Sequence, residues 1–159
     1  MIEFRQFREE DSESVRSMMR EYPIQFPTFV IDRYPLRWAQ FVTNGDESKS
    51  HFIVATKLNK VIGHSGYIYN TELNMYEIVG VVVSKDYSRN GIGRELLAII
   101  SSSINQHGSQ KVFLYTLGHP ENQGTINFYK SIGFELVNYE EDFFAQGYSR
   151  VTFLKELVS

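Results

Sequence analysis

Cysteine is absent from the 159 residues, which excludes disulfide bonds, thiolate metal sites and catalysis through a cysteine acyl-enzyme. No apolar run reaches the roughly 20 residues that span a membrane, and residues 1–5 have no signal-peptide pattern. The net charge is −3 with no long run of one sign, which argues against nucleic-acid binding through phosphate contacts. We therefore expect a cytoplasmic protein with no nucleic-acid or membrane partner. We also expect no metal, because metal-ligand spacing is absent among the four histidines, His51, His64, His107 and His119.

The sequence does contain enough apolar material for one folded domain. Its length and its 42% apolar content predict a single domain over residues 1–159. Apolar and alternating runs predict strands at residues 2–7, 51–58, 61–69, 78–83, 111–116, 134–144 and 148–154. Helical spacing predicts helices at residues 12–19, 32–42, 92–107 and 121–131. The order β-α-α-β-β-β-α-β-α-β-β indicates an α/β fold with one mixed sheet and helices on both faces.

Residues 77–97 combine a buried strand, a loop with two glycines and the start of a helix. The run Ile78–Val83 is short and β-branched, which favours a strand buried on both faces. Ile92 and Leu96 then begin the helical spacing. Free backbone N–H groups and the positive end of the helix dipole meet at such a loop, which predicts a phosphate-binding site. An ordinary strand-to-helix turn that contains two glycines is the alternative.

The loop differs from two common nucleotide-binding motifs. The dinucleotide-binding Gly-x-Gly-x-x-Gly turn follows its strand directly, whereas residues 84–90 intervene here and Leu96 takes the place of the third glycine. A Walker A loop requires Gly-Lys-Ser/Thr, which does not occur here. The loop instead resembles the acetyl-CoA pyrophosphate loop of the GNAT superfamily of N-acetyltransferases, Arg/Gln-x-x-Gly-x-Gly/Ala. Here it reads Ser88-Arg89-Asn90-Gly91-Ile92-Gly93, followed by Arg94, with Ser88 where Arg or Gln is usual and Arg89 one place later.

A second stretch, residues 122–134, resembles the other signature of that superfamily, Asn-x-x-Ala-x-x-Phe-Tyr-x-x-x-Gly-Phe. Asn122 and Tyr129 are seven residues apart and therefore share one helical face. Thr125 replaces the usual alanine, and Gly133 ends the helix. Taken alone, Asn122 could equally be an N-cap and Tyr129 a packing residue. The two signatures in this order imply a GNAT-like fold, with a central, mostly antiparallel sheet flanked by helices.

The resemblance implies an acetyl-CoA-dependent N-acetyltransferase that acts on a primary amine of a small molecule or peptide. Backbone N–H groups of residues 88–94 would hold the pyrophosphate, and Asn122 and Tyr129 would also bind the cofactor. The peptide-like pantetheine arm would pair with the strand edge at Val81, Val82 and Val83. Gly80 in mid-strand indicates a bulge that opens this edge, or else only close packing. A non-catalytic acyl-CoA-binding sensor is the alternative function.

Catalytic roles follow from the same resemblance. Tyr129 would lie near the sulfur as general acid, because a phenol can protonate a thiolate without strong tuning of its pKa. Glu77 lies fourteen residues before Gly91, which matches the glutamate base of the histone-acetyltransferase branch. A surface glutamate at a strand end, with a water chain as base, is the alternative, and His64 is a second candidate base.

The acceptor wall is expected from residues 22–34, the hairpin at residues 60–75 and the loop at residues 143–148. These segments are rich in aromatic side chains, and the acidic residues 140–142 lie next to the last of them. Such a site would suit a cationic amine, unless the acidic residues form a solvated surface. The exposed terminal strands are compatible with a homodimer.

Overall fold

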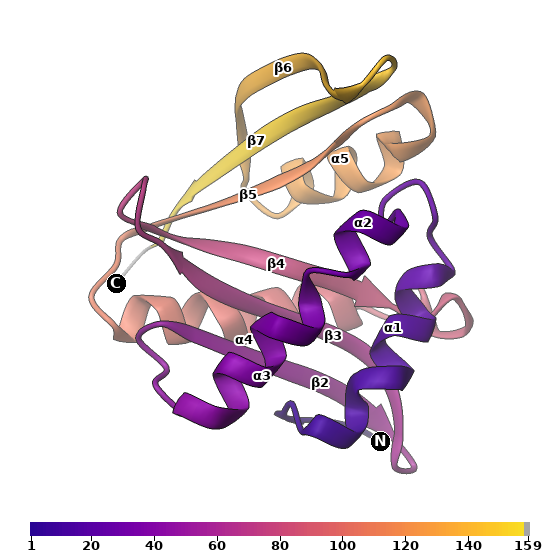
Figure 1. Cartoon of the computed structure of the whole chain (residues 1–159), viewed down its shortest axis with the longest axis vertical. Coiled ribbons are helices and arrows are strands. Elements are labelled where there is room, and N and C mark those ends of the chain that lie inside the picture. The colour runs from indigo at the N-terminus through magenta and orange to yellow at the C-terminus, as the bar shows by residue number, and fades with distance from the viewer. Residues whose placement is uncertain (158–159) are drawn as a thin grey trace.

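The computed structural model describes residues 1–157, which form one seven-stranded sheet with helices on both faces (Figure 1). The sheet order is β1-β2-β3-β4-β5-β7-β6, and only β4 and β5 pair in parallel. This architecture confirms the predicted fold class. The strands are β1 (Ile2–Gln6), β2 (Ser50–Lys57), β3 (Lys60–Asn70), β4 (Met75–Val83), β5 (Lys111–Gly118), β6 (Glu135–Ala145) and β7 (Tyr148–Glu156).

Two hydrophobic cores lie on opposite faces of the sheet. The helices α1 (Ser12–Arg20), α2 (Thr28–Ile31) and α3 (Tyr34–Asn44) pack on one face, and α4 (Ile92–Gln106) and α5 (Gln123–Ser131) cover the other (Figure 1). Successive residues of β2 show this division, because Phe52 packs against the first group and Ile53 against the second. The central strands are thus buried on both faces, which explains their nearly continuous apolar sequence. No helix within residues 1–157 is long and apolar enough to cross a membrane.

The predicted elements are all present, with shifted ends. One helix was not predicted, because α2 has only four residues, too few to show a helical period, and follows the extended Pro27. Helix α5 begins two residues later than predicted, since a 3₁₀ turn (Pro120–Asn122) precedes it. Gly108 follows the end of α4 with a φ of +85°, as expected for a glycine C-cap.

A β-bulge divides β4 into two halves. His64 of β3 pairs with Val82 and Gly66 pairs with Val79, so that Gly80 and Val81 together face Ser65. Gly80 has a φ of +68°, and a Cβ there would lie 2.8 Å from His64 Cε1, so the position requires glycine. This is the bulge that the sequence indicated.

Beyond the bulge, β4 leaves β5. Parallel pairing between the two strands covers only residues 76–78 of β4 and 112–114 of β5. Strand β5 continues instead alongside β7 as far as Gly118. The second half of β4 therefore has an open edge in the middle of the sheet, and Figure 1 shows the two strands diverging.

Candidate active site

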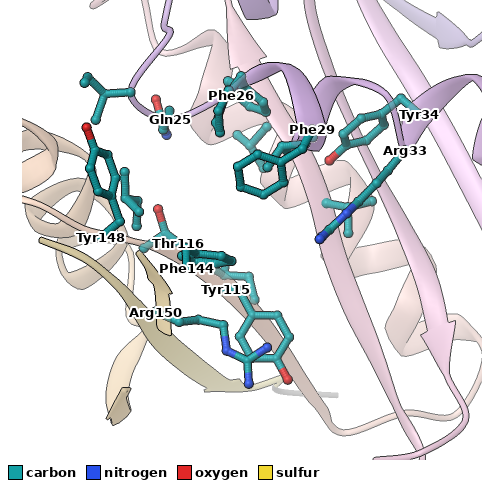
Figure 2. Close-up of a pocket in the computed structure, with 18 of the residues that line it drawn as sticks. Gln25, Phe26, Phe29, Arg33, Tyr34, Tyr115, Thr116, Phe144, Tyr148 and Arg150 are labelled. Atoms are coloured by element: carbon teal, nitrogen blue, oxygen red, sulfur yellow. The ribbon is translucent and has the colours of Figure 1, made fainter. Parts of the chain in front are cut away.

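A cavity of about 530 Å³ occupies the space between the diverging strands β4 and β5. Its walls come from the α1–α2 connection, α2 and the start of α3 on one side, and from the β6–β7 hairpin on the other (Figure 2). Phe29 of α2 and Phe144 of β6 approach across it, with ring centroids 6.2 Å apart. The cavity is lined by residues of segments 23–37, 77–81, 114–117 and 143–150 and by Tyr129.

Glu77 lies at the inner end of this cavity, where β4 is still paired on both sides. Its neighbours in the sheet are Ile68 of β3 and Phe113 of β5. Burial raises the pKa of the Glu77 carboxyl above its ordinary value, against the opposing effects of a long hydrogen bond from Asn70 (3.4 Å) and of nearby arginines. A carboxylate with a raised pKa in a cavity is a suitable proton acceptor near neutral pH.

Tyr129 reaches the same cavity from α5, on the other side of the sheet. Its side chain is only 4% exposed, and its ring packs against Phe134 and Phe153. Burial raises the pKa of the Tyr129 phenol, so the hydroxyl stays protonated at neutral pH. Among residues 1–157 no group forms a hydrogen bond with this hydroxyl, which leaves it available as a proton donor.

His64 is not a base, contrary to one expectation from the sequence. Its ring is fully buried, Nε2 lies 3.0 Å from Trp38 Nε1 and Nδ1 lies 2.7 Å from the Gly80 carbonyl oxygen. Because the indole N–H can only donate, Nε2 accepts and the protonated Nδ1 donates to Gly80. Burial lowers the pKa of His64 to about 4, which keeps the ring neutral. His64 therefore holds the carbonyl group of the bulge and has no lone pair left for substrate.

The loop before α4 presents a row of unpaired backbone donors. Gly91 is the N-cap with a φ of +75°, and no side chain caps the helix. The N–H groups of residues 89–94 make no hydrogen bond within residues 1–157. Ser88 differs, because its N–H (3.3 Å) and its hydroxyl (3.0 Å) both donate to the Lys85 carbonyl. The donors for a phosphate group thus begin at Arg89 and not at Ser88 as expected.

Gly93 has no structural reason to be glycine. Its φ is not positive, and a Cβ would meet only Phe128 Cζ at 3.5 Å and Val83 Cγ2 at 3.8 Å, which is ordinary contact. A glycine within a helix costs about 1 kcal/mol relative to alanine. Close approach of a ligand to the backbone would explain the residue, as it does in phosphate-binding loops.

The open edge of β4 is partly engaged. Ser84 N–H donates to the Ile62 carbonyl (2.9 Å), and by the antiparallel alternation Val83 turns its N–H and carbonyl away from β3. The Val83 carbonyl accepts a hydrogen bond from the Tyr22 hydroxyl (2.7 Å). Val82 pairs with His64, and Val81 lies in the bulge and lines the cavity.

Asn122 ties the end of β5 to α5. Its side-chain amide donates to the Leu117 carbonyl (2.7 Å) and to Thr116 Oγ1 (3.2 Å). It stands at the N-cap position of α5 without making a side-chain cap. Asn122 is buried, and only its amide oxygen would remain for a ligand.

Two features of the expected acceptor wall are wrong. No residue of the hairpin at 60–75 lines the cavity, and Tyr67 of that hairpin is buried with its hydroxyl bonded to the Glu47 carbonyl. The acidic residues do not line it either. Glu140 forms a bidentate pair with Arg150 (2.7 and 3.1 Å), and Asp142 accepts the Gly147 N–H in the hairpin turn.

Three arginines replace the expected carboxylates in the cavity wall: Arg33, Arg37 and Arg150. They were not predicted from the sequence. Their one sequence signal is the four-residue spacing of Arg33 and Arg37, which places both on one face of a helix. Arg150 carries no such signal, since its position depends on strand pairing.

Comparison with known proteins adds to this geometry. The sequence profile of the acetyltransferase (GNAT) family matches residues 13–134. None of the curated proteins searched matches the chain. Among solved structures, a GNAT-family protein from Desulfovibrio desulfuricans superposes with a TM-score of 0.88 at 21% identity, covering 99% of this chain and 100% of that one.

Two further solved structures contain a coenzyme. An aminoglycoside 6′-N-acetyltransferase in complex with coenzyme A has a TM-score of 0.75 at 12% identity, covering 99% of this chain and 98% of that one. A protein from Salmonella typhimurium with acetyl-CoA has a TM-score of 0.77 at 14% identity, covering 100% and 95%. At these identities the likeness shows the fold.

Proposed function

This chain belongs to the acetyltransferase (GNAT) family, and we propose that it moves the acetyl group of acetyl-CoA to a primary amine. The observation that carries the proposal is the open edge of β4, where one cavity holds both Glu77 and Tyr129. The donor row at residues 89–94 lies at the start of α4, which follows β4 after the 3₁₀ turn Lys85–Tyr87. Two structures with this fold contain coenzyme A or acetyl-CoA, which supports acetyl-CoA as the co-substrate.

Three groups of residues bind acetyl-CoA in this proposal. Backbone N–H groups of residues 89–94 and the positive end of α4 bind the pyrophosphate. Val81 and Val83 offer backbone groups to the pantetheine arm, with Tyr22 giving up the Val83 carbonyl on binding. Arg89 and Arg94, both exposed and without a carboxylate partner within residues 1–157, add positive charge.

Glu77 and Tyr129 handle the two protons of the reaction. Glu77 takes a proton from the ammonium group, directly or through water, so that the amine nitrogen can attack the thioester carbonyl. The nitrogen–carbon bond then forms, the carbon–sulfur bond breaks, and the Tyr129 hydroxyl gives its proton to the leaving thiolate. The nitrogen loses its second proton as the amide forms, and that proton passes through water to the Tyr129 oxygen, which restores the phenol. The raised pKa of Glu77 suits its role as base. Burial keeps the Tyr129 hydroxyl protonated at neutral pH, but the raised pKa also makes it a weaker acid than an exposed tyrosine.

Two measurements test the proposal. A ligand that binds the native state raises the melting temperature, so acetyl-CoA should do so, whereas ATP and NAD should not. Release of free CoA, followed with a thiol reagent, should then depend on added amine across a panel of amines, amino acids and peptides. Stabilisation by acetyl-CoA without release for any amine would instead indicate a sensor. No stabilisation would remove the proposed co-substrate.

A further inference from the structure

We propose that the acceptor is a small molecule that carries a carboxylate as well as the reacting amine, of the size and chemistry of an amino acid. This inference rests on the proposed function and deepens it. It follows from the charges of the cavity wall, which are opposite to those that the sequence suggested. A cationic acceptor without an anionic group, such as a polyamine, is the class that these charges disfavour.

The wall carries three guanidinium groups and one carboxylate, that of Glu77. Arg150 is neutralised by Glu140 and stacks between Tyr115 (4.1 Å) and Phe143 (3.7 Å), so it is fixed in place. Arg33 and Arg37 have no carboxylate within 4.0 Å among residues 1–157. Two cations therefore line the cavity without a directly paired carboxylate.

These arginines lie near the proposed base. The charges of Arg37, Arg150 and Arg33 each act to lower the pKa of Glu77, against the larger effect of burial, so all three are within electrostatic reach of its carboxyl group. Figure 2 shows Arg33 and Arg150 extending into the cavity from opposite walls. A molecule with its amine at Glu77 would thus place a nearby carboxylate among guanidinium groups, which bind carboxylates in a bidentate manner.

Aromatic contacts of Arg33 and Arg37 favour a role in binding the acceptor carboxylate over a role as solvated surface residues. The Arg37 guanidinium lies 5.2 Å from the ring centroid of Tyr34, and that of Arg33 lies 5.8 Å from the centroid of Phe29. Such cation–π contacts favour these positions of the two guanidinium groups, although Arg33 is exposed. Ordered guanidinium groups lose less entropy when they bind an anion.

The shape of the cavity favours a small molecule over a protein side chain. Phe29 of α2 and Phe144 of β6 narrow the cavity where they approach each other across it. Its volume of about 530 Å³ falls in the range of small-molecule sites, and it must also hold the end of the pantetheine arm. The aromatic walls would accommodate an apolar body between the amine and the solvent.

The test compares matched acceptors in the CoA-release assay. The panel contains the proteinogenic amino acids, their α-amides, the amines left after removal of the carboxyl group, spermidine and peptides with free N-termini. We expect the best acceptor to be a carboxylate, with kcat/KM at least about tenfold above that of its amide, since hydrogen bonds to a charged group are worth this much or more.

Arginine variants locate the effect. Arg37→Gln and Arg33→Gln should each raise KM for the carboxylated acceptor on the order of 10- to 100-fold, with a much smaller change in kcat and in KM for its amide. Arg20→Gln is the matched control, because Arg20 is an exposed arginine of α1 that pairs with Glu13 and does not line the cavity. Arg20→Gln should leave KM and kcat unchanged for both the carboxylated acceptor and its amide.

The outcomes separate this inference from the proposed function. Turnover of spermidine, of a neutral amine or of peptides in clear preference to every amino acid would overturn the inference and leave the acetyltransferase intact. Equal losses for acid and amide in the arginine variants would overturn it as well. Failure of every member of the panel would exclude an amino acid as acceptor. Combined with stabilisation by acetyl-CoA, that result would indicate a sensor, and without such stabilisation it would also remove the proposed co-substrate.

Discussion

The burial of His64 predicts a dependence of stability on pH that one substitution should abolish. Burial lowers the pKa of His64 to about 4, whereas an unfolded chain titrates its histidines near 6.5. The unfolded state therefore takes up the proton first as pH falls. The resulting stabilisation of the folded state is complete above about pH 6.5 and is lost as pH falls toward 4, a change of about 3 kcal/mol.

His64→Gln is the variant to measure, because an amide can still donate to Gly80 and accept from Trp38 but does not titrate. Urea unfolding should be followed at several pH values between 7 and 4.5 by the fluorescence of Trp38, the only tryptophan. The parent should lose about 2 kcal/mol more than the variant over this range. His119→Gln, on a partly exposed histidine beside the cavity hairpin, controls for the general effect of removing an imidazole.

His64→Phe measures the hydrogen bonds themselves. It keeps the stacking on Phe52 (5.7 Å) but leaves the Gly80 carbonyl and the Trp38 N–H unpaired in the core. Each buried unpaired group costs about 1–3 kcal/mol, so the free energy of unfolding at pH 7 should fall by about 2–6 kcal/mol.

Equal pH dependence of the free energy of unfolding in the parent and in His64→Gln would refute the buried neutral histidine as the source of the pH effect.

Four further predictions concern the reaction. Gly93→Glu should abolish acetyl-CoA binding in isothermal titration while the fold persists, because its Cβ has room but the side chain opposes the phosphates; binding within threefold of the parent would refute the loop assignment. Gly91→Glu should do the same with an added loss of stability from its positive φ. Tyr129→Phe should lower kcat on the order of 10²-fold with little change in acetyl-CoA affinity, and unchanged turnover would make Tyr129 a packing residue. Glu77→Gln should lower kcat/KM roughly 10²- to 10³-fold at pH 7 and recover at high pH, where more amine is unprotonated; near-parental activity across the pH profile would favour a water chain.

Local sequence predicted the fold because its decisive features are local. The apolar run ending at Val83, the glycines at 91 and 93, and the helical spacing after them specify strand, loop and helix without reference to the rest of the chain. Gly80 could be interpreted for the same reason, since a glycine within an apolar strand has few explanations. A helix leaves its first backbone N–H groups unpaired. The loop at residues 89–94 therefore has the free N–H groups that the sequence predicted.

The chemistry of the acceptor wall could not be predicted, because it depends on strand register. Glu140 stands directly opposite Arg150 across β6 and β7, and this pairing removes its charge from the cavity. The register is then interrupted between Glu140 and Ala145, where β6 has four residues for one on β7. That irregular segment includes Phe143 and Phe144, which line the cavity. No pattern in the sequence specifies where such an interruption begins.

The role of His64 shows how the two halves of the site depend on each other. Trp38 of α3 donates to His64 of β3, and His64 donates to Gly80 of β4, so one chain of hydrogen bonds connects α3 to the bulge of β4. Tyr34 of α3 also packs against the bulge, because a Cβ at Gly80 would lie 2.9 Å from its Cε1. Helix α3 therefore both supplies a wall of the acceptor site and maintains the bulge that opens β4. A change of acceptor specificity made on the buried face of α3 should consequently alter acetyl-CoA binding too, whereas a change at Arg33 or Arg37 should not.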